Sequence, residues 1–229
     1  MFMKKNMRLS GILFATALIP TAAVLIALQF LPAEIPAHYD INMNIDRWGS
    51  KYESLIMPAA TILMSAFMYG MSRFAAKQEN GAGNEKVMMI CGISFNLLFL
   101  AMTIWSLVLA FNAVSGREIN GVLSVKIIFI FAGIAIAVVG NFMPKCRLNS
   151  LVGLRTRWST ANEDVWFKCQ RFGGVLFVIC GIMMSLFSAL ADSIMLILTV
   201  NIIITATAVG GSAAVSKIIY DRHQGSGGK

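Results

Sequence analysis

The chain has 229 residues, of which 57% are hydrophobic and only 13% are charged, and its mean hydropathy is +0.73. A soluble domain of this length cannot bury so much apolar surface, so the composition excludes a soluble protein and indicates a membrane protein. The net charge is +8, and the excess basic side chains are expected to contact anionic lipid headgroups. No direct nucleic-acid partner is expected.

Six apolar stretches are each long enough to cross the hydrocarbon core, which takes roughly 20 residues of helix. Helices are required because backbone groups in lipid must pair internally, and no alternating barrel pattern is present. The predicted fold is therefore all-α, a polytopic membrane protein whose six transmembrane helices cover about 9–31, 54–72, 87–116, 122–143, 172–191 and 193–216.

The two ends of the chain raise questions of processing. The first apolar stretch follows a basic segment, as in a signal peptide, but it is too long for one and no cleavage site follows, so a retained helix is expected. The last residues, 225–229, read GSGGK and are typical of an added linker. The sequence between them is expected to form a two-helix module over 1–86 and a four-helix module over 87–224.

The distribution of lysine and arginine predicts the orientation in the cell membrane. With the amino terminus inside, fourteen of these residues lie in cytoplasmic segments and only four in outer segments, Arg47, Lys51, Arg117 and Lys126. Both termini are then cytoplasmic, residues 32–53 form an extracellular loop, and 144–171 form a cytoplasmic loop. The four cysteines lie in spans or in the inner loop, so no disulfide is implied.

Several residues inside the spans predict helix contacts. Pro20 and Pro58 are expected to kink the first two helices. Asn96, Asn141 and Asn201 are expected to form hydrogen bonds between helices, because an amide alone in lipid is costly. Lys126 lies one turn inside its span and is expected to extend toward the outer surface.

The second half of the cytoplasmic loop carries a helix-start pattern. Thr160 and Glu163 have the spacing of a capping box, and the acids at 163 and 164 suit a helix amino terminus. Val165, Trp166, Cys169 and Phe172 then fall on one side at helical spacing. A short amphipathic helix at the inner membrane interface, running into the fifth span, is therefore predicted.

The stretches at 31–51 and 149–174 each carry a recognisable motif, and together they resemble the SdpI family of bacterial membrane proteins and the amino-terminal domain often joined to it. The first, LPAEIPAHYDINMNIDRWGSK at 31–51, matches that domain's pattern except that Met43 stands where glycine is usual. The second, NSLVGLRTRWSTANEDVWFKCQRFGG at 149–174, matches the family pattern except that Arg157 replaces a proline. Glycine takes positive φ at low cost and methionine does not, so a distorted turn is expected at Met43.

The resemblance implies a membrane protein of toxin immunity and signal transduction. Such a protein protects its cell from a secreted toxin peptide and captures a helix-turn-helix autorepressor at the membrane. By this resemblance the extracellular ligand-binding residues are His38, Tyr39, Asp40, Asp46, Trp48 and Lys51. The cytoplasmic partner-binding residues are Asn149, Gly153, Arg155, Thr156, Trp158, Glu163, Trp166 and Arg171.

Two other functions remain open on the sequence. Kinked helices and asparagines in the spans permit a small transporter or channel, although no deep ionisable residue supports it. His38 with Glu34, Asp40 and Asp46 permits a metal-dependent enzyme with an outward-facing site, although no catalytic motif is present. The prediction is therefore no enzyme, no catalytic residues, no metal and no cofactor, and the sequence leaves the oligomeric state open.

Overall fold

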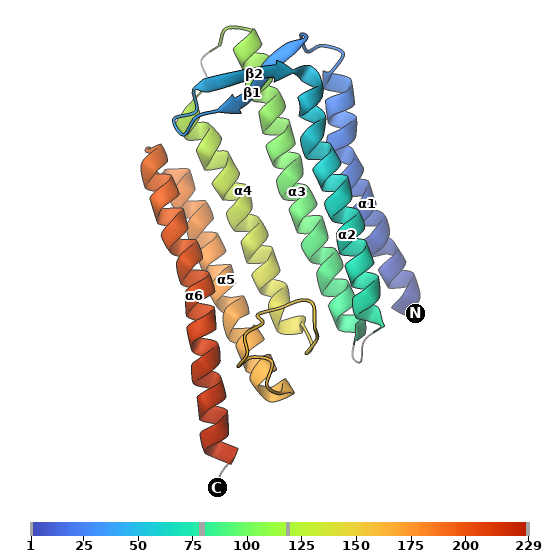
Figure 1. Ribbon diagram of the computed structural model, residues 1–229, viewed down its shortest axis with the longest axis vertical. Helices are drawn as coiled ribbons and strands as arrows, with labels where there is room; N and C mark the ends of the chain where they lie inside the picture. Colours follow the sequence, from blue (N-terminus) through green and yellow to red (C-terminus); the bar gives the residue numbers. More distant parts are fainter. Residues whose placement is uncertain (1, 78–80, 118–119, 228–229) are drawn as a thin grey trace.

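Six long helices run side by side along the long axis of the molecule (Figure 1). The computed structural model describes residues 2–77, 81–117 and 120–227. The helices are α1 Phe2–Ala27, α2 Ile56–Ala76, α3 Gly81–Val114, α4 Gly121–Phe142, α5 Glu163–Leu190 and α6 Ile194–Gly227. All six are long and apolar enough to cross a membrane, which confirms the predicted all-α polytopic fold. The predicted added linker at 225–229 falls partly within α6, whose last described residue is Gly227.

A β-hairpin covers one end of the bundle, and the loop between α4 and α5 folds at the other end, where both termini also lie (Figure 1). We call these the hairpin end and the loop end. The helices form two groups, α1–α3 and α4–α6, and α3 packs mainly against α1 and α2. The predicted division into modules at 1–86 and 87–224 stays a prediction.

A buried amide joins the three helices of the first group. Asn96 of α3 is fully buried. Its Nδ2 donates to the Leu13 carbonyl oxygen at 2.8 Å and to Thr16 Oγ1 at 3.0 Å, and its Oδ1 accepts from Ser65 Oγ at 2.9 Å. The predicted hydrogen bonds between helices are confirmed here, because α1, α2 and α3 all meet at this side chain.

Glycines bring α4 and α5 into backbone contact. A Cβ atom at Gly181 would lie 2.5 Å from the Gly133 carbonyl oxygen, and one at Gly174 would lie 2.7 Å from the Gly140 carbonyl oxygen. Gly133 and Gly140 are two turns apart on α4, as are Gly174 and Gly181 on α5. Small residues at this spacing let two helices in lipid approach closely, so packing between backbones holds the second group together.

Other predictions for the spans have mixed outcomes. Asn201 of α6 donates to Ser188 Oγ of α5 at 2.9 Å, as predicted. Asn141 is instead exposed on the last turn of α4, so its predicted bond between helices is wrong within the described residues. Pro58 is the third residue of α2, where a missing N–H breaks no helical bond, and it therefore introduces no mid-helix kink. Lys126 Nζ lies 2.9 Å from Asp192 Oδ1, so its ammonium is paired at the hairpin end.

The hairpin was not predicted from the sequence. Strands β1, Glu34–Tyr39, and β2, Ile45–Ser50, pair antiparallel, and a 3-10 helix η1, Lys51–Leu55, leads into α2. Consecutive Ile35 and Pro36 are both buried, and the register shifts beyond Pro36. The strict alternation that marks a half-buried strand is therefore missing from the sequence.

The start of α5 differs from the predicted capping box. The helix begins at Glu163, and Asn162 is its cap, with Oδ1 accepting from the Val165 N–H at 2.9 Å. Thr160 cannot serve, because its hydroxyl donates to the Thr156 carbonyl oxygen at 3.0 Å. The predicted amphipathic segment is the first part of α5 itself, with Val165, Trp166 and Cys169 buried, whereas Phe172 is 39% exposed and does not share that face.

Candidate functional site

The turn of the hairpin is organised by Asp40. Its Oδ1 accepts from the backbone N–H of Asn42 at 2.9 Å and of Asn44 at 2.8 Å, while its Oδ2 accepts from Asn44 Nδ2. The hydrogen bond from the Asn44 side chain is the largest cause that holds the pKa of Asp40 below its ordinary value. The carboxylate therefore stays charged at neutral pH and is largely used by its own turn.

Met43 fits this turn in spite of its side chain. Its φ is +66°, the left-handed conformation that usually favours glycine. The expected distortion is absent, since Asp40 still accepts both turn N–H groups. The Met43 side chain packs against a cluster formed by Val125, Ala191 and Ile197, and its Cβ lies 2.8 Å from where a Cβ of Gly121 would be. Methionine therefore anchors the hairpin tip on the α4–α6 group, a contact that glycine would not provide.

Exposed polar and aromatic groups lie on the hairpin surface. His38 Nδ1 lies 2.7 Å from Asp46 Oδ1 across the two strands, with side chains 63% and 45% exposed. Trp48 on β2 is 50% exposed. Tyr39 is partly buried, and this burial raises the pKa of its hydroxyl. Of the predicted ligand-binding residues, His38, Asp46 and Trp48 are thus the most accessible to a molecule that arrives at this end.

Lys51 joins the hairpin to α1. Its Nζ donates to the carbonyl oxygens of Leu28 at 2.9 Å and Leu31 at 3.3 Å, just beyond the last residue of α1. A cation at a helix carboxyl end satisfies carbonyl groups that have no helical partner. The neighbouring Gly49 has no room for a side chain, because its Cβ would lie 2.8 Å from the Ala37 Cβ. These two motif residues build the hairpin and its junction with the helices.

At the loop end, Asn149 and Gly153 shape the chain after α4. Asn149 Oδ1 accepts from the N–H groups of Leu151 and Val152, and its Nδ2 donates to the Val152 carbonyl oxygen at 3.0 Å. Gly153 has a φ of +112°, and a Cβ there would lie 2.9 Å from the Trp166 ring. Only glycine satisfies both conditions, so this motif position is fixed by local structure.

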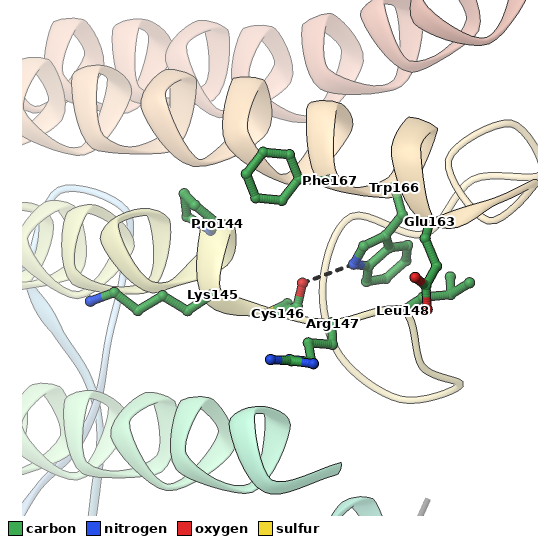
Figure 2. A pocket seen from close by; sticks show the side chains of 8 residues that line it. All are labelled: Pro144, Lys145, Cys146, Arg147, Leu148, Glu163, Trp166 and Phe167. Atoms are coloured by element: carbon green, nitrogen blue, oxygen red, sulfur yellow. Dashed lines mark hydrogen bonds between the residues drawn. The ribbon is translucent and has the colours of Figure 1, made fainter. Parts of the chain in front are cut away.

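Trp166 and Gln170 of α5 form hydrogen bonds with the backbone of the loop. The Trp166 indole is 2% exposed and donates from Nε1 to the Cys146 carbonyl oxygen at 2.9 Å, as Figure 2 shows. Gln170 is fully buried; its Oε1 accepts from the Leu154 N–H at 2.8 Å, and its Nε2 donates to the Leu154 carbonyl oxygen at 2.9 Å. Gln170 was not among the predicted site residues. The signal that could have identified it is an amide four residues after Trp166, which places both side chains on one face of the helix.

Thr156 ties the loop to α6. Its N–H donates to Ser159 Oγ at 2.8 Å, its Oγ1 accepts from the Ser159 N–H at 3.0 Å, and its Oγ1 lies 2.8 Å from Ser216 Oγ of α6. The loop therefore contacts both neighbouring helices of the second group. The predicted partner-binding residues Asn149, Gly153, Thr156 and Trp166 all have such local contacts.

The remaining predicted residues of this end lie at the surface. Arg155, Glu163 and Arg171 are exposed, and Trp158 is half-buried beneath the Arg157 guanidinium, 4.7 Å from its ring centre. Arg155 donates from Nη1 to the Ser150 carbonyl oxygen. Together with Lys168 they give the loop end a mainly basic surface with aromatic rings.

An open pocket of about 410 Å³ adjoins this surface (Figure 2). Its walls come from the loop and from the first turns of α5. They combine two cationic side chains, one carboxylate and several apolar groups: Pro144, Lys145, Cys146, Arg147, Leu148, Glu163, Trp166 and Phe167. We call it the loop-end pocket. Such a mixed surface suits a protein or peptide side chain better than a small apolar ligand.

The two predicted groups of site residues lie at opposite ends of the bundle, so they form two separate surfaces (Figure 1). Within residues 2–77, 81–117 and 120–227, no group of three or more His, Cys, Asp and Glu side chains has the arrangement of a metal site. Glu34, which the metal-enzyme alternative groups with His38, is exposed at the start of β1.

Cys146 should be chemically inert in the folded protein. Burial, with a smaller effect of Cys91, raises the pKa of its thiol to about 12. Because the thiolate is the reactive form and the pKa is raised, Cys146 stays protonated up to that pH. We expect iodoacetamide at pH 8 to leave Cys146 unmodified by mass spectrometry, while a cysteine placed at the exposed Ser150 reacts. Equal modification rates at both positions would contradict this burial.

The fold and its two polar ends define a multi-pass membrane protein with a surface at each end of the bundle. Residues 145–220 match the SdpI/YfhL protein family, and residues 15–62 match a domain of unknown function, DUF1648. The chain is 25% identical over 202 residues to the immunity protein SdpI of Bacillus subtilis (strain 168). The aligned region covers 88% of this chain and 91% of that protein. No solved structure gives a significant match. The resemblance predicted from the two motifs is confirmed by both family matches and by the similarity to this immunity protein.

Proposed function

We propose that this chain is a non-enzymatic immunity and signal-transduction protein of the bacterial cell membrane, protecting its cell against a secreted toxin peptide. The observation that carries the proposal is its similarity to the immunity protein SdpI over most of both chains. In this proposal the hairpin end faces the outside and meets the toxin. The loop end, with both termini, faces the cytoplasm and meets a helix-turn-helix autorepressor.

The hairpin supports the first part of this proposal. It is the folded polar element at its end of the bundle, and the exposed His38, Asp46 and Trp48 lie on it. A half-exposed tryptophan on the same hairpin as the His38–Asp46 hydrogen bond suits an amphipathic peptide, because tryptophan is enriched among the residues that dominate binding energy at interfaces. Met43 packs on the α4–α6 group, so a ligand that moves the hairpin acts directly on those helices.

Protection is tested by expressing the chain in a toxin-sensitive bacterium and measuring survival against purified toxin peptide. Trp48→Ala and His38→Ala should each lower the highest toxin concentration that the cells survive by roughly ten-fold. A central interface residue contributes about 1–2 kcal/mol or more to binding. Tyr52→Ala is the matched control, because Tyr52 is more exposed than Trp48 but lies outside the predicted binding residues. Wild-type chain that reaches the membrane and gives no protection would refute the immunity function.

Orientation is tested separately with a membrane-impermeant maleimide on intact cells. The native cysteines are buried, so single exposed cysteines introduced at Asn42 and Ser150 report the hairpin end and the loop end. We expect labelling at 42 in intact cells and at 150 only after lysis. The reverse pattern would remove the hairpin from the toxin's side of the membrane and end this receptor arrangement.

The loop-end pocket supports the second part of the proposal. Phe167 lines the pocket and is 54% exposed, and Arg171 lies one turn further along α5. We expect Phe167→Ala and Arg171→Ala to reduce membrane capture of the repressor, measured by co-sedimentation with membrane vesicles. Arg222→Ala, an exposed arginine near the end of α6, should have no effect. Unchanged capture in both test variants would move the docking surface elsewhere.

A further inference from the structure

A second cavity lies inside the loop end, between the two groups of helices. It has a volume of about 230 Å³ and is distinct from the loop-end pocket, although Cys146 contributes to both. Its walls come from α3, α4, α5 and the loop: Val87, Cys91, Val139, Met143, Phe177 and residues 152–155, with Cys146. We call it the inter-helix cavity.

The cavity combines an apolar interior with one cation. Among its described lining residues, Arg155 is the one charged side chain, and it is exposed to solvent. One of its N–H groups donates to the Ser150 carbonyl oxygen. A guanidinium has five N–H donors in a planar fork, so others remain for an anion such as phosphate. The chemistry therefore fits a ligand with an apolar chain and an anionic head.

The position of the cavity favours a lipid as that ligand. It lies where α4 ends at Phe142, and the Lys145 ammonium sits 4.2 Å from the Phe142 ring centre. Lysine, arginine and tryptophan near the ends of spans mark the depth of lipid headgroups. A volume of 230 Å³ equals about seven or eight water-sized volumes, which admits part of an acyl chain but not a helix about 10 Å wide.

We propose that the inter-helix cavity binds an anionic phospholipid, with part of an acyl chain among α3, α4 and α5 and the phosphate on Arg155. Bound there, the lipid bridges the two groups of helices at the loop end, where Val87 and Cys91 of α3 already pack with Cys146 and Trp166. The proposal does not rest on toxin immunity, because the hairpin takes no part in it and Cys146 is the one lining residue that the cavity shares with the loop-end pocket.

The test is native mass spectrometry of the full purified chain titrated with phosphatidylglycerol or phosphatidylcholine of identical acyl chains. We expect tighter binding of phosphatidylglycerol, and Arg155→Gln should lower that affinity by about ten-fold, as expected when a charge-assisted hydrogen bond is lost. Val152→Phe fills the cavity from the loop and should lower the affinity for both lipids. This second variant keeps the site testable if Arg155→Gln alters the loop.

The matched controls are Arg157→Gln, which removes a neighbouring arginine that does not line the cavity, and Ile179→Phe on the exposed face of α5. Both should bind phosphatidylglycerol like the wild type. Equal affinity for the two lipids, or equal losses in Arg155→Gln and Arg157→Gln, would overturn the proposal. Saturable binding of free palmitate that is tighter than that of phosphatidylglycerol would assign the cavity to a fatty acid and overturn it too.

Discussion

Gly181→Val is expected to destabilise the protein by at least about 3 kcal/mol, the upper end of the usual cost of overpacking a buried site. A Cβ at Gly181 would lie 2.5 Å from the Gly133 carbonyl oxygen and 2.7 Å from the Ala137 backbone nitrogen. Both obstacles belong to the backbone of α4, so no side-chain rotation can make room. The two helices must move apart along their whole contact.

The measurement is thermal unfolding of the detergent-solubilised chain, followed by the loss of the monodisperse peak in size-exclusion chromatography. Gly210→Val on α6 is the matched control, because no heavy atom lies within 4 Å of a Cβ at that position. Its unfolding temperature should stay close to that of the wild type. A Gly181→Val protein as stable as Gly210→Val would show that α4 and α5 are not in backbone contact.

The sequence predicts the spanning helices well because lipid leaves few alternatives. Backbone groups in hydrocarbon must bond within a helix, so length and hydropathy alone locate six spans. The same reasoning identifies Asn96 and Asn201, whose amides are costly in lipid unless another helix supplies a partner. It fails for Asn141, because hydropathy locates the span but does not indicate which face of the helix a residue lies on, and Asn141 lies on an exposed face of the last turn of α4.

The hairpin was beyond this reasoning for a different reason. Its strands are held by contacts specific to this turn, including Asp40 on backbone N–H groups and His38 against Asp46. Neither contact leaves a periodic pattern in the sequence. Met43 replaces the expected glycine and still takes a φ of +66°, since its side chain gains packing on the α4–α6 group that glycine lacks. That compensation depends on residues more than 75 positions away along the chain, as at Val125 and Ala191.

The motif residues illustrate how far a family pattern leads. It indicates which positions matter but not why. Lys51, Asn149, Gly153 and Trp166 were predicted to bind ligands or partners, and each has a local contact that shapes its own segment. Binding by these residues stays a prediction. Gln170 falls at a variable position of the pattern, so the pattern gave no reason to select it.

Gln170→Leu is the second change expected to have a large effect. Leucine has a similar length and stays apolar, but it removes the partner of the Leu154 N–H and one of two donors to the Leu154 carbonyl oxygen, which the Ser159 hydroxyl still bonds at 2.8 Å. A backbone N–H left without a partner costs about 1–3 kcal/mol, and the carbonyl oxygen keeps the Ser159 hydroxyl, so the loss is about 1–3 kcal/mol, most of it in the loop. We expect the loop to become accessible to protease while the spans stay folded.

Limited proteolysis at the loop end measures this effect directly, with cleavage sites mapped by mass spectrometry between residues 147 and 162. Gln170→Glu keeps the side-chain length and an acceptor oxygen, but an ionised carboxylate at this fully buried position has no proton to donate to the Leu154 carbonyl oxygen. Burying that charge is costly, so Gln170→Glu should be cleaved at least as fast as Gln170→Leu. Arg171→Leu, next to it but exposed, should resist cleavage like the wild type. Cleavage of Gln170→Leu at the wild-type rate would mean that Trp166 and Thr156 hold the loop without Gln170, and that the amide contributes little to its order.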